Sequence, residues 1–374
     1  MKGLYITTYD ANNAYSGVCK KITSQVSVFE HYGISMSLVD AGSIKEVSSS
    51  TLLNQLSSLF GRNNKAVWKQ LFDVSNNLLL KDDYEFIYIR KTLLDSFQVR
   101  CLRDIKNNHP NIKIIVEIPT YPYDNEIRLS QKLALRNDKR VRCSLQGIVD
   151  RFVTYSKDKE IFGIPTIVIP NGINYQNVPI RKPIEHKGIN VIAVALFEDW
   201  HGYDRFLDGM IKQKDTVTKY NINFYLAGKG RILASYRDKV EKNGLNKYVH
   251  FCGELRGKDL DDLYNIADIA LDCMGRHRVG LYYNSSLKGK EYCAHGVPII
   301  SGIETELDSV GDFPYYMRVP ANDTLIDMND VVYYFNCCYQ NKDINTVVTT
   351  IRKKSKSRFD FIYAFKPVVD FVKQ

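Results

Sequence analysis

The sequence predicts an α/β protein of two doubly wound domains, and three observations support this fold class. Its 374 residues are enough for two cores, because domains usually have about 100 to 200 residues. Short β-branched segments alternate with segments of helical periodicity in the first half, and the alternation starts again at Ile189. A polar segment between the halves, residues 174–188, contains Pro179 and Pro183 and has the composition of a linker.

The first half predicts a parallel sheet, since runs such as 86–89 and 112–116 are short and β-branched, as buried parallel strands are. A helix is expected over about 18–32. Gly17, at its start, would let the backbone approach a ligand closely, although simple turn chemistry is the alternative. The expected strands are 2–7, 35–40, 85–90, 112–118 and 151–154, with a last one beginning near 167.

Polar residues follow the strand that ends at Ile118. Open α/β sheets bind ligands at the carboxyl ends of their strands, so side chains in this loop are candidates to hold or polarise a substrate hydroxyl. The alternative is a rigid turn in which an aspartate caps the next helix. The candidates are Glu117, Tyr121, Asp124 and Glu126.

The second half repeats the pattern, with strands expected at 189–196, 223–227, 249–253 and 267–271. Gly228-Lys-Gly230 lacks the third glycine of a dinucleotide fingerprint and is weak evidence by itself. Cations that follow these strands are suited to neutralising phosphate, while His201 is alternatively a turn histidine over Trp200. The candidates are His201, Arg205, Lys229 and Arg276.

The segment 284–302 predicts a loop, a helix and a buried strand. Ser285 or Ser286 can cap the helix, whose first N–H groups suit phosphate. Lys288 and Glu291 share one helix face, where an ammonium neutralises a diphosphate and a carboxylate accepts two hydrogen bonds from a diol such as ribose. The alternative is an ordinary amphipathic helix with a solvated ion pair.

This segment resembles the donor-binding segment of GT-B glycosyltransferases, family 4 in particular, where Lys-x-x-Glu-Tyr-x-Ala-x-Gly-x-Pro recurs. Val-Ile-Pro-Asn-Gly at 168–172, Trp-His-Gly at 200–202 and Phe-x-Gly at 251–253 are similar to further motifs of that family. A second family glutamate is replaced by Tyr283, and an arginine and a lysine by Leu196 and His201. The main pattern stands at Lys288, Glu291, Tyr292, Ala294, Gly296 and Pro298.

The resemblance implies the GT-B fold, two Rossmann-like domains that face each other across a cleft. Residues 1–180 would bind the acceptor, together with a returning C-terminal helix at 356–374, and residues 181–355 the nucleotide-sugar donor. Without the resemblance, the amphipathic end of the chain could equally be a core helix of the second domain. The implied reaction transfers a hexose from a UDP- or GDP-linked donor to a sugar or lipid-linked acceptor during surface polysaccharide assembly. Retention of configuration, with neither metal nor cofactor, is also implied.

Site residues follow from the same resemblance. Lys288, His201 and Asp124 are expected to be catalytic, the first two by stabilising the departing nucleoside diphosphate. Gly17, Glu117, Tyr121 and Glu126 are expected on the acceptor side. Donor binding is assigned to Glu291, Ser286, Leu287, Gly228, Lys229, Gly253, Arg276 and Arg205.

Charge and composition limit the partners. The net charge of +9 permits anionic partners, and much of it lies in a basic cluster at 126–146 with the residues Arg128, Lys132, Arg136, Lys139, Arg140 and Arg142. That cluster is a solvated helix face or a contact with anionic membrane. Nucleic acid is not expected, because aromatic residues are not interleaved with the cluster.

Eight cysteines without Cys-x-x-Cys spacing indicate reduced thiols. The absence of a long apolar run favours the cytoplasm, with the inner face of the cell membrane as the alternative. Two rival functions stay open: a sugar-nucleotide epimerase and a non-catalytic partner subunit with the same fold.

Overall fold

The structure, a computed structural model, describes residues 1–12, 16–45, 63–124, 131–311 and 313–374. It consists of two compact units, one formed by Met1–Pro170 with Phe361–Gln374 and the other by Asn171–Asp360. The expected borders at 180 and 356 both fall inside the second unit. Among the described residues, no helix is both long enough and apolar enough to cross a membrane.

The first unit contains a seven-stranded sheet in the order β2-β1-β3-β4-β5-β7-β6, parallel except for the β6–β7 pair. The sequence did not predict β6. Phe162 and Gly163 both have positive φ angles, and they form the two-residue turn of this hairpin. The strands are β1 (Lys2–Ile6), β2 (Ser35–Val39), β3 (Phe86–Arg90), β4 (Lys113–Ile118), β5 (Arg151–Thr154), β6 (Glu160–Ile161) and β7 (Ile164–Val168).

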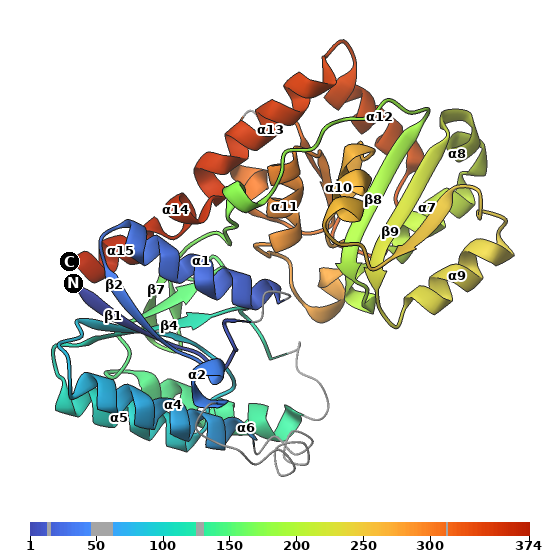
Figure 1. The fold of residues 1–374 in the computed structure, drawn as a ribbon. Helices are drawn as coiled ribbons and strands as arrows, with labels where there is room; N and C mark the ends of the chain where they lie inside the picture. The colour runs from blue at the N-terminus through green and yellow to red at the C-terminus, as the bar shows by residue number, and fades with distance from the viewer. Residues whose placement is uncertain (13–15, 46–62, 125–130, 312) are drawn as a thin grey trace. The chain divides into compact units, whose positions relative to one another are not determined.

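Helices cover both faces of this sheet (Figure 1). Leu4 and Ile6 of β1 pack on the face covered by α4 and α5, while Tyr5 between them packs with α1 and the C-terminal helices. The C-terminal segment therefore belongs to the first unit. The helices are α1 (Gly17–His31), α2 (Ala41–Lys45), α4 (Asn63–Leu79), α5 (Ser96–Asn108), α6 (Lys132–Val141), α14 (Phe361–Ala364) and α15 (Lys366–Lys373).

The second unit has a six-stranded sheet, all parallel, in the order β10-β9-β8-β11-β12-β13. Strand order reverses between β8 and β11, and such a reversal opens a crevice at the carboxyl ends of the strands. The strands are β8 (Ile189–Leu196), β9 (Ile222–Lys229), β10 (Val249–Gly253), β11 (Ile269–Leu271), β12 (Ile299–Ser301) and β13 (Tyr316–Arg318). The helices are α7 (Asp204–Lys212), α8 (Lys214–Tyr220), α9 (Leu233–Lys242), α10 (Lys258–Asn265), α11 (Leu287–His295), α12 (Met328–Tyr339) and α13 (Ile344–Phe359).

The segment expected as a linker is instead bonded into the second unit. The backbone N–H of Lys182 donates to the Asn265 side-chain oxygen at 2.7 Å. Arg181 is buried, and its guanidinium donates to the carbonyl oxygens of Gly296 and Ala267 and to the Tyr339 hydroxyl. Proline and polar composition indicated a linker, but these hydrogen bonds fix the segment against the unit.

Glu117, expected on the acceptor side, is fully buried in the first unit. Its carboxylate forms ion pairs with Lys21 of α1, at 3.3 Å, and with Arg90 of β3. It also accepts hydrogen bonds from Gln25 and the Tyr88 hydroxyl, each at 2.8 Å. Burial alone would raise the pKa of Glu117, but the charges of Lys21 and Arg90 outweigh burial and lower that pKa to about 2. Glu117 is therefore a structural carboxylate.

Replacing Glu117 by Gln should destabilise the first unit strongly, because the buried Arg90 guanidinium, which stays charged, loses its counter-charge. The expected loss is about 3–5 kcal/mol in the free energy of unfolding at pH 7. The pKa of Glu117 is lower in the folded state than in the unfolded state. The stabilisation that its carboxylate gives the wild type is therefore present above the unfolded pKa and is lost as pH falls towards about 2. Denaturant unfolding at several pH values measures both effects, with the exposed Glu160→Gln as the control. Equal stability of the two variants at pH 7 would contradict this role.

Candidate functional site

A cavity of about 570 Å³ lies in the second unit, where strands β8 and β9 end and β10 is followed by a loop. Its size is within the usual range of ligand pockets. The wall contains four residues expected from the sequence and several that were not: Val194, Ala195, Leu196, Trp200, His201, Ala227, Gly228, Lys229, Glu254, Leu255, Arg256 and Lys288.

Two glycines bring the loops after β8 and β11 into backbone contact. A Cβ atom at Gly202 would meet the backbone of Gly275, and one at Gly275 would meet Gly202. Here the Met274 N–H donates to the carbonyl oxygen of His201 at 2.6 Å. Next to this contact, the Arg276 guanidinium lies 4.5 Å from the centre of the Trp200 ring. The contact fixes His201 at the topological switch point of the sheet.

His201 is a neutral donor in this fold. Its Nδ1 accepts the backbone N–H of Glu198 at 3.1 Å, so the ring proton is carried by Nε2. Burial, together with the charges of Lys288 and Arg276, lowers the pKa of His201 to about 2. Its ring lies parallel to that of Tyr203, 10° apart in plane. The side chain can therefore donate a hydrogen bond to a ligand without carrying a charge.

The expected helix of the 284–302 segment is α11, and its ends are confirmed. Ser286 is the N-cap and accepts the Gly289 N–H, while Gly296 has a positive φ at the C-cap. The Ser286 hydroxyl also donates to Asp272 at 2.7 Å. Lys288 lines the cavity from the first turn and donates to the Cys273 sulfur at 3.3 Å. The first turn of α11 is therefore held at the cavity wall.

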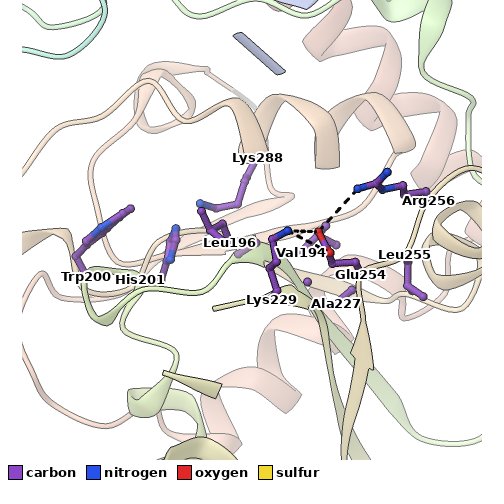
Figure 2. A pocket seen from close by; sticks show the side chains of 12 residues that line it. Val194, Leu196, Trp200, His201, Ala227, Lys229, Glu254, Leu255, Arg256 and Lys288 are labelled. Atoms are coloured by element: carbon purple, nitrogen blue, oxygen red, sulfur yellow. Dashed lines mark hydrogen bonds and ion pairs between the residues drawn. The ribbon is translucent and has the colours of Figure 1, made fainter. Parts of the chain in front are cut away.

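Three charged residues stand together where β9 and β10 end. Figure 2 shows Lys229 and Arg256 directed at Glu254, with the closest nitrogen–oxygen distances at 3.1 and 3.9 Å. All three side chains are largely exposed, and exposed pairs contribute little stability. Glu254 and Arg256 were not predicted as site residues, although both follow directly after a predicted strand, which could have indicated them.

Several expected donor-binding residues are placed differently. Arg205 does not line the cavity, and its buried guanidinium donates to the carbonyl oxygens of Met274, Pro320 and Thr324. Glu291 is exposed on α11 and is not part of the cavity wall. Leu287 begins α11 and is half-buried, and Gly253 ends β10.

The acceptor-side candidates belong to the first unit. Gly17 is the first residue of α1, and a Cβ there would meet no atom within 4 Å. The ring of Tyr121 packs edge-on against Phe162. Glu126 lies outside the described residues.

Asp124, expected to be catalytic, accepts a hydrogen bond from Arg142 at 2.9 Å and pairs with Lys139 at 3.0 Å. Burial would raise its pKa, but the hydrogen bonds from Arg142 and Lys139 lower it, so Asp124 is held as a carboxylate. In this geometry its partners are the basic residues of α6 and of the turn after it.

Comparison with solved structures identifies the fold. A sucrose-phosphate synthase from Thermosynechococcus elongatus superposes with a TM-score of 0.66 at 12% identity, covering 100% of this chain and 99% of that one. A glycosyltransferase from Rickettsia africae gives 0.65 at 14% identity, covering 100% and 98%. WaaG, a glycosyltransferase involved in lipopolysaccharide biosynthesis, gives 0.62 at 13% identity, covering 100% and 99%. The chain therefore has the GT-B fold. No family model and no curated protein matches the sequence.

Gly228 shapes the cavity floor, because a Cβ there would overlap the carbonyl oxygen of Ala195 on β8. Gly228→Ala should therefore lower the free energy of unfolding by about 2 kcal/mol or more, from overpacking and a φ of +137°. Gly253→Ala is the matched control, since its φ is also positive but its Cβ would meet nothing within 4 Å. Chemical denaturation compares the two, and an equal loss of stability in both variants would exclude the overlap as the cause.

Proposed function

We propose that this protein is a glycosyltransferase that binds the nucleoside diphosphate of a sugar donor in the 570 Å³ cavity. The observation that carries the proposal is the convergence of Lys288, Lys229 and neutral His201 on one cavity beside the first turn of α11. Helix starts and ammonium groups both favour phosphate. The GT-B fold supports glycosyl transfer as the reaction class by analogy with the structures of similar fold.

The proposed chemistry is stabilisation of the leaving group. Breaking the bond between sugar and phosphate leaves new negative charge on the diphosphate, so a fixed cation interacts more strongly with the transition state than with bound donor. Lys288 supplies that charge, and Cys273 holds its ammonium in place. His201 donates a neutral hydrogen bond through Nε2, and its low pKa makes this contribution independent of pH between 5 and 8.

Lys229 has a resting partner that donor binding would replace. Its ammonium pairs with Glu254, and both side chains are about half exposed or more. Because such a pair contributes at most about 1 kcal/mol, a diphosphate can take over the ammonium at small cost. Glu291 and Arg276 remain proposed donor contacts, the first for ribose and the second for phosphate.

The finer parts of the proposal rest on the family resemblance. They are a UDP- or GDP-linked donor, a sugar or lipid-linked acceptor of surface polysaccharide, and retention of configuration. Incubating the purified protein with nucleotide sugars separates the rivals, because an epimerase yields an isomeric nucleotide sugar and a partner subunit yields no product. A thermal-shift screen of nucleotides identifies the base, since ligand binding adds directly to stability.

Replacing Lys288 by Ala should lower turnover about a hundredfold or more while changing the Michaelis constant less, because the lost charge acts mainly on the transition state. Steady-state kinetics with the donor from the thermal-shift screen measures both constants. Lys258→Ala is the control, since Lys258 is an exposed lysine on α10 whose partner is Asp262. Turnover near that of the wild type in Lys288→Ala would refute the leaving-group role.

A second proposal concerns the exposed face of α6, which we infer contacts anionic membrane. Lys132, Arg136 and Arg140 recur every fourth residue and are exposed, as is Leu133, with 76% of its surface accessible. Each cation near an anionic surface adds about 1 kcal/mol of binding, and an exposed leucine can insert among headgroups. Lys139 and Arg142 are instead engaged by Asp124. Arg128 lies outside the described residues.

Reversing these three charges together, Lys132→Glu, Arg136→Glu and Arg140→Glu, should abolish co-sedimentation with phosphatidylserine or phosphatidylglycerol vesicles at low salt. Wild-type binding should also fall steeply with salt, because exposed charges are screened within about 8 Å at physiological ionic strength. A triple reversal at exposed lysines of the second unit, Lys214, Lys219 and Lys242, controls for net charge. Equal sedimentation of wild type with neutral and anionic vesicles would count decisively against membrane contact.

A further inference from the structure

A second cavity, of about 350 Å³, opens in the second unit where β12 and β13 end. Its wall contains no residue of the 570 Å³ cavity. The lining residues are Tyr282, Gly302, Glu304, Arg318 and Val319, followed by Pro320 and Ala321. We call it the β12–β13 cavity.

The walls of the β12–β13 cavity are fixed by hydrogen bonds. Arg205, which does not face the first cavity, donates to the carbonyl oxygens of Pro320 at 3.0 Å and Thr324 at 2.7 Å. Two further lining residues are also joined, since the Glu304 N–H donates to the carbonyl oxygen of Tyr282 at 3.2 Å. A Cβ at Gly302 would meet the backbone of Met274, so this glycine permits the close packing of the floor. The cavity is therefore formed before any ligand arrives, as binding sites usually are.

Three side chains give this cavity a distinctive chemistry. The Tyr282 side chain is 62% exposed, so its ring is accessible to a ligand. Glu304, which carries a carboxylate, also lines the cavity. Arg318 is half exposed, and its Nε forms an ion pair with Asp308 at 3.2 Å, which orients the guanidinium. The cavity thus offers an apolar ring face, a strong acceptor and strong donors.

Sugars match this combination better than other small ligands. A pyranose has a face of C–H groups that packs on an aromatic ring, and its vicinal hydroxyls bond in pairs to carboxylates and guanidinium groups. A phosphate would meet the unfavourable charge of Glu304. A nucleoside diphosphate is better matched by the 570 Å³ cavity, whose lining includes the ammonium groups of Lys229 and Lys288.

We propose that the β12–β13 cavity binds one pyranose unit of a saccharide, with its apolar face on Tyr282 and its hydroxyls on Glu304 and Arg318. This is a separate saccharide site of the second unit, and it does not depend on donor binding in the first cavity. The occupant is a free sugar or a terminal glycoside rather than the nucleotide.

The test is saturation-transfer difference NMR of the full chain with the methyl glycosides of glucose, galactose and N-acetylglucosamine. At least one should bind in the millimolar range, with its C–H protons receiving most saturation. Tyr282→Ala should weaken that binding about tenfold or more, and Tyr282→Phe should preserve it, because only the ring is needed. Tyr333→Ala, which removes another exposed tyrosine, on α12, is the matched control and should leave binding unchanged.

Absence of saturation transfer to every glycoside would overturn the proposal, as would unchanged binding in Tyr282→Ala. Lys288→Ala separates the two cavities, since it should retain sugar binding here. If nucleoside diphosphates fail to bind while a glycoside binds through Tyr282, the proposed function fails and this site stands. If Lys288→Ala loses sugar binding and Tyr282→Ala keeps it, the sugar binds in the first cavity and the β12–β13 site is refuted.

Discussion

The second unit depends on the backbone contact at Met274. The Met274 N–H donates to the carbonyl oxygen of His201, its own carbonyl oxygen accepts from the Arg205 guanidinium, and Gly302 packs directly against its backbone. Met274, in the loop that follows β11, thereby joins the loop that carries His201 to the walls of the β12–β13 cavity. A side chain at Gly202 or Gly275 would separate the loops after β8 and β11, and a side chain at Gly302 would meet the backbone of Met274, so each cavity has its own close approach to the loop after β11.

Buried charge serves two different purposes in this protein. In the first unit, Glu117 neutralises Lys21 and Arg90 inside the core, and the three side chains connect β3, β4 and α1. In the second unit, the buried guanidinium of Arg205 has carbonyl oxygens as partners and fixes loops. Neither group is available to a substrate, since removing a buried charge from its partners costs several kcal/mol. The groups suited to ligand binding are those with exposed or weak partners, such as Lys229 and Lys288.

Electrostatics at the first cavity combine fixed and exchangeable charge. Burial, together with the charges of Lys288 and Arg276, lowers the pKa of His201 and keeps it neutral, so the imidazole contributes direction rather than charge. Glu254 pairs with Lys229 at the surface, and an exposed pair of this kind is weak. This division suits a ligand that is anionic when bound and more anionic as it leaves, because the fixed ammonium and helix dipole interact most with the developing charge.

Hydrophobic periodicity and capping chemistry are local, so the fold class, most strand positions and the extent of α11 from cap to cap could be predicted from the sequence. The sequence also indicated His201, Gly228, Lys229 and Lys288, which follow strand ends or open a helix and do line one cavity. The structural roles of Glu117 and Arg205 could not be predicted in this way, since their partners lie far away in the chain and their burial follows from packing. The β12–β13 cavity was likewise invisible in the sequence, because Tyr282, Glu304 and Arg318 come together only through the sheet register and the contact at Met274.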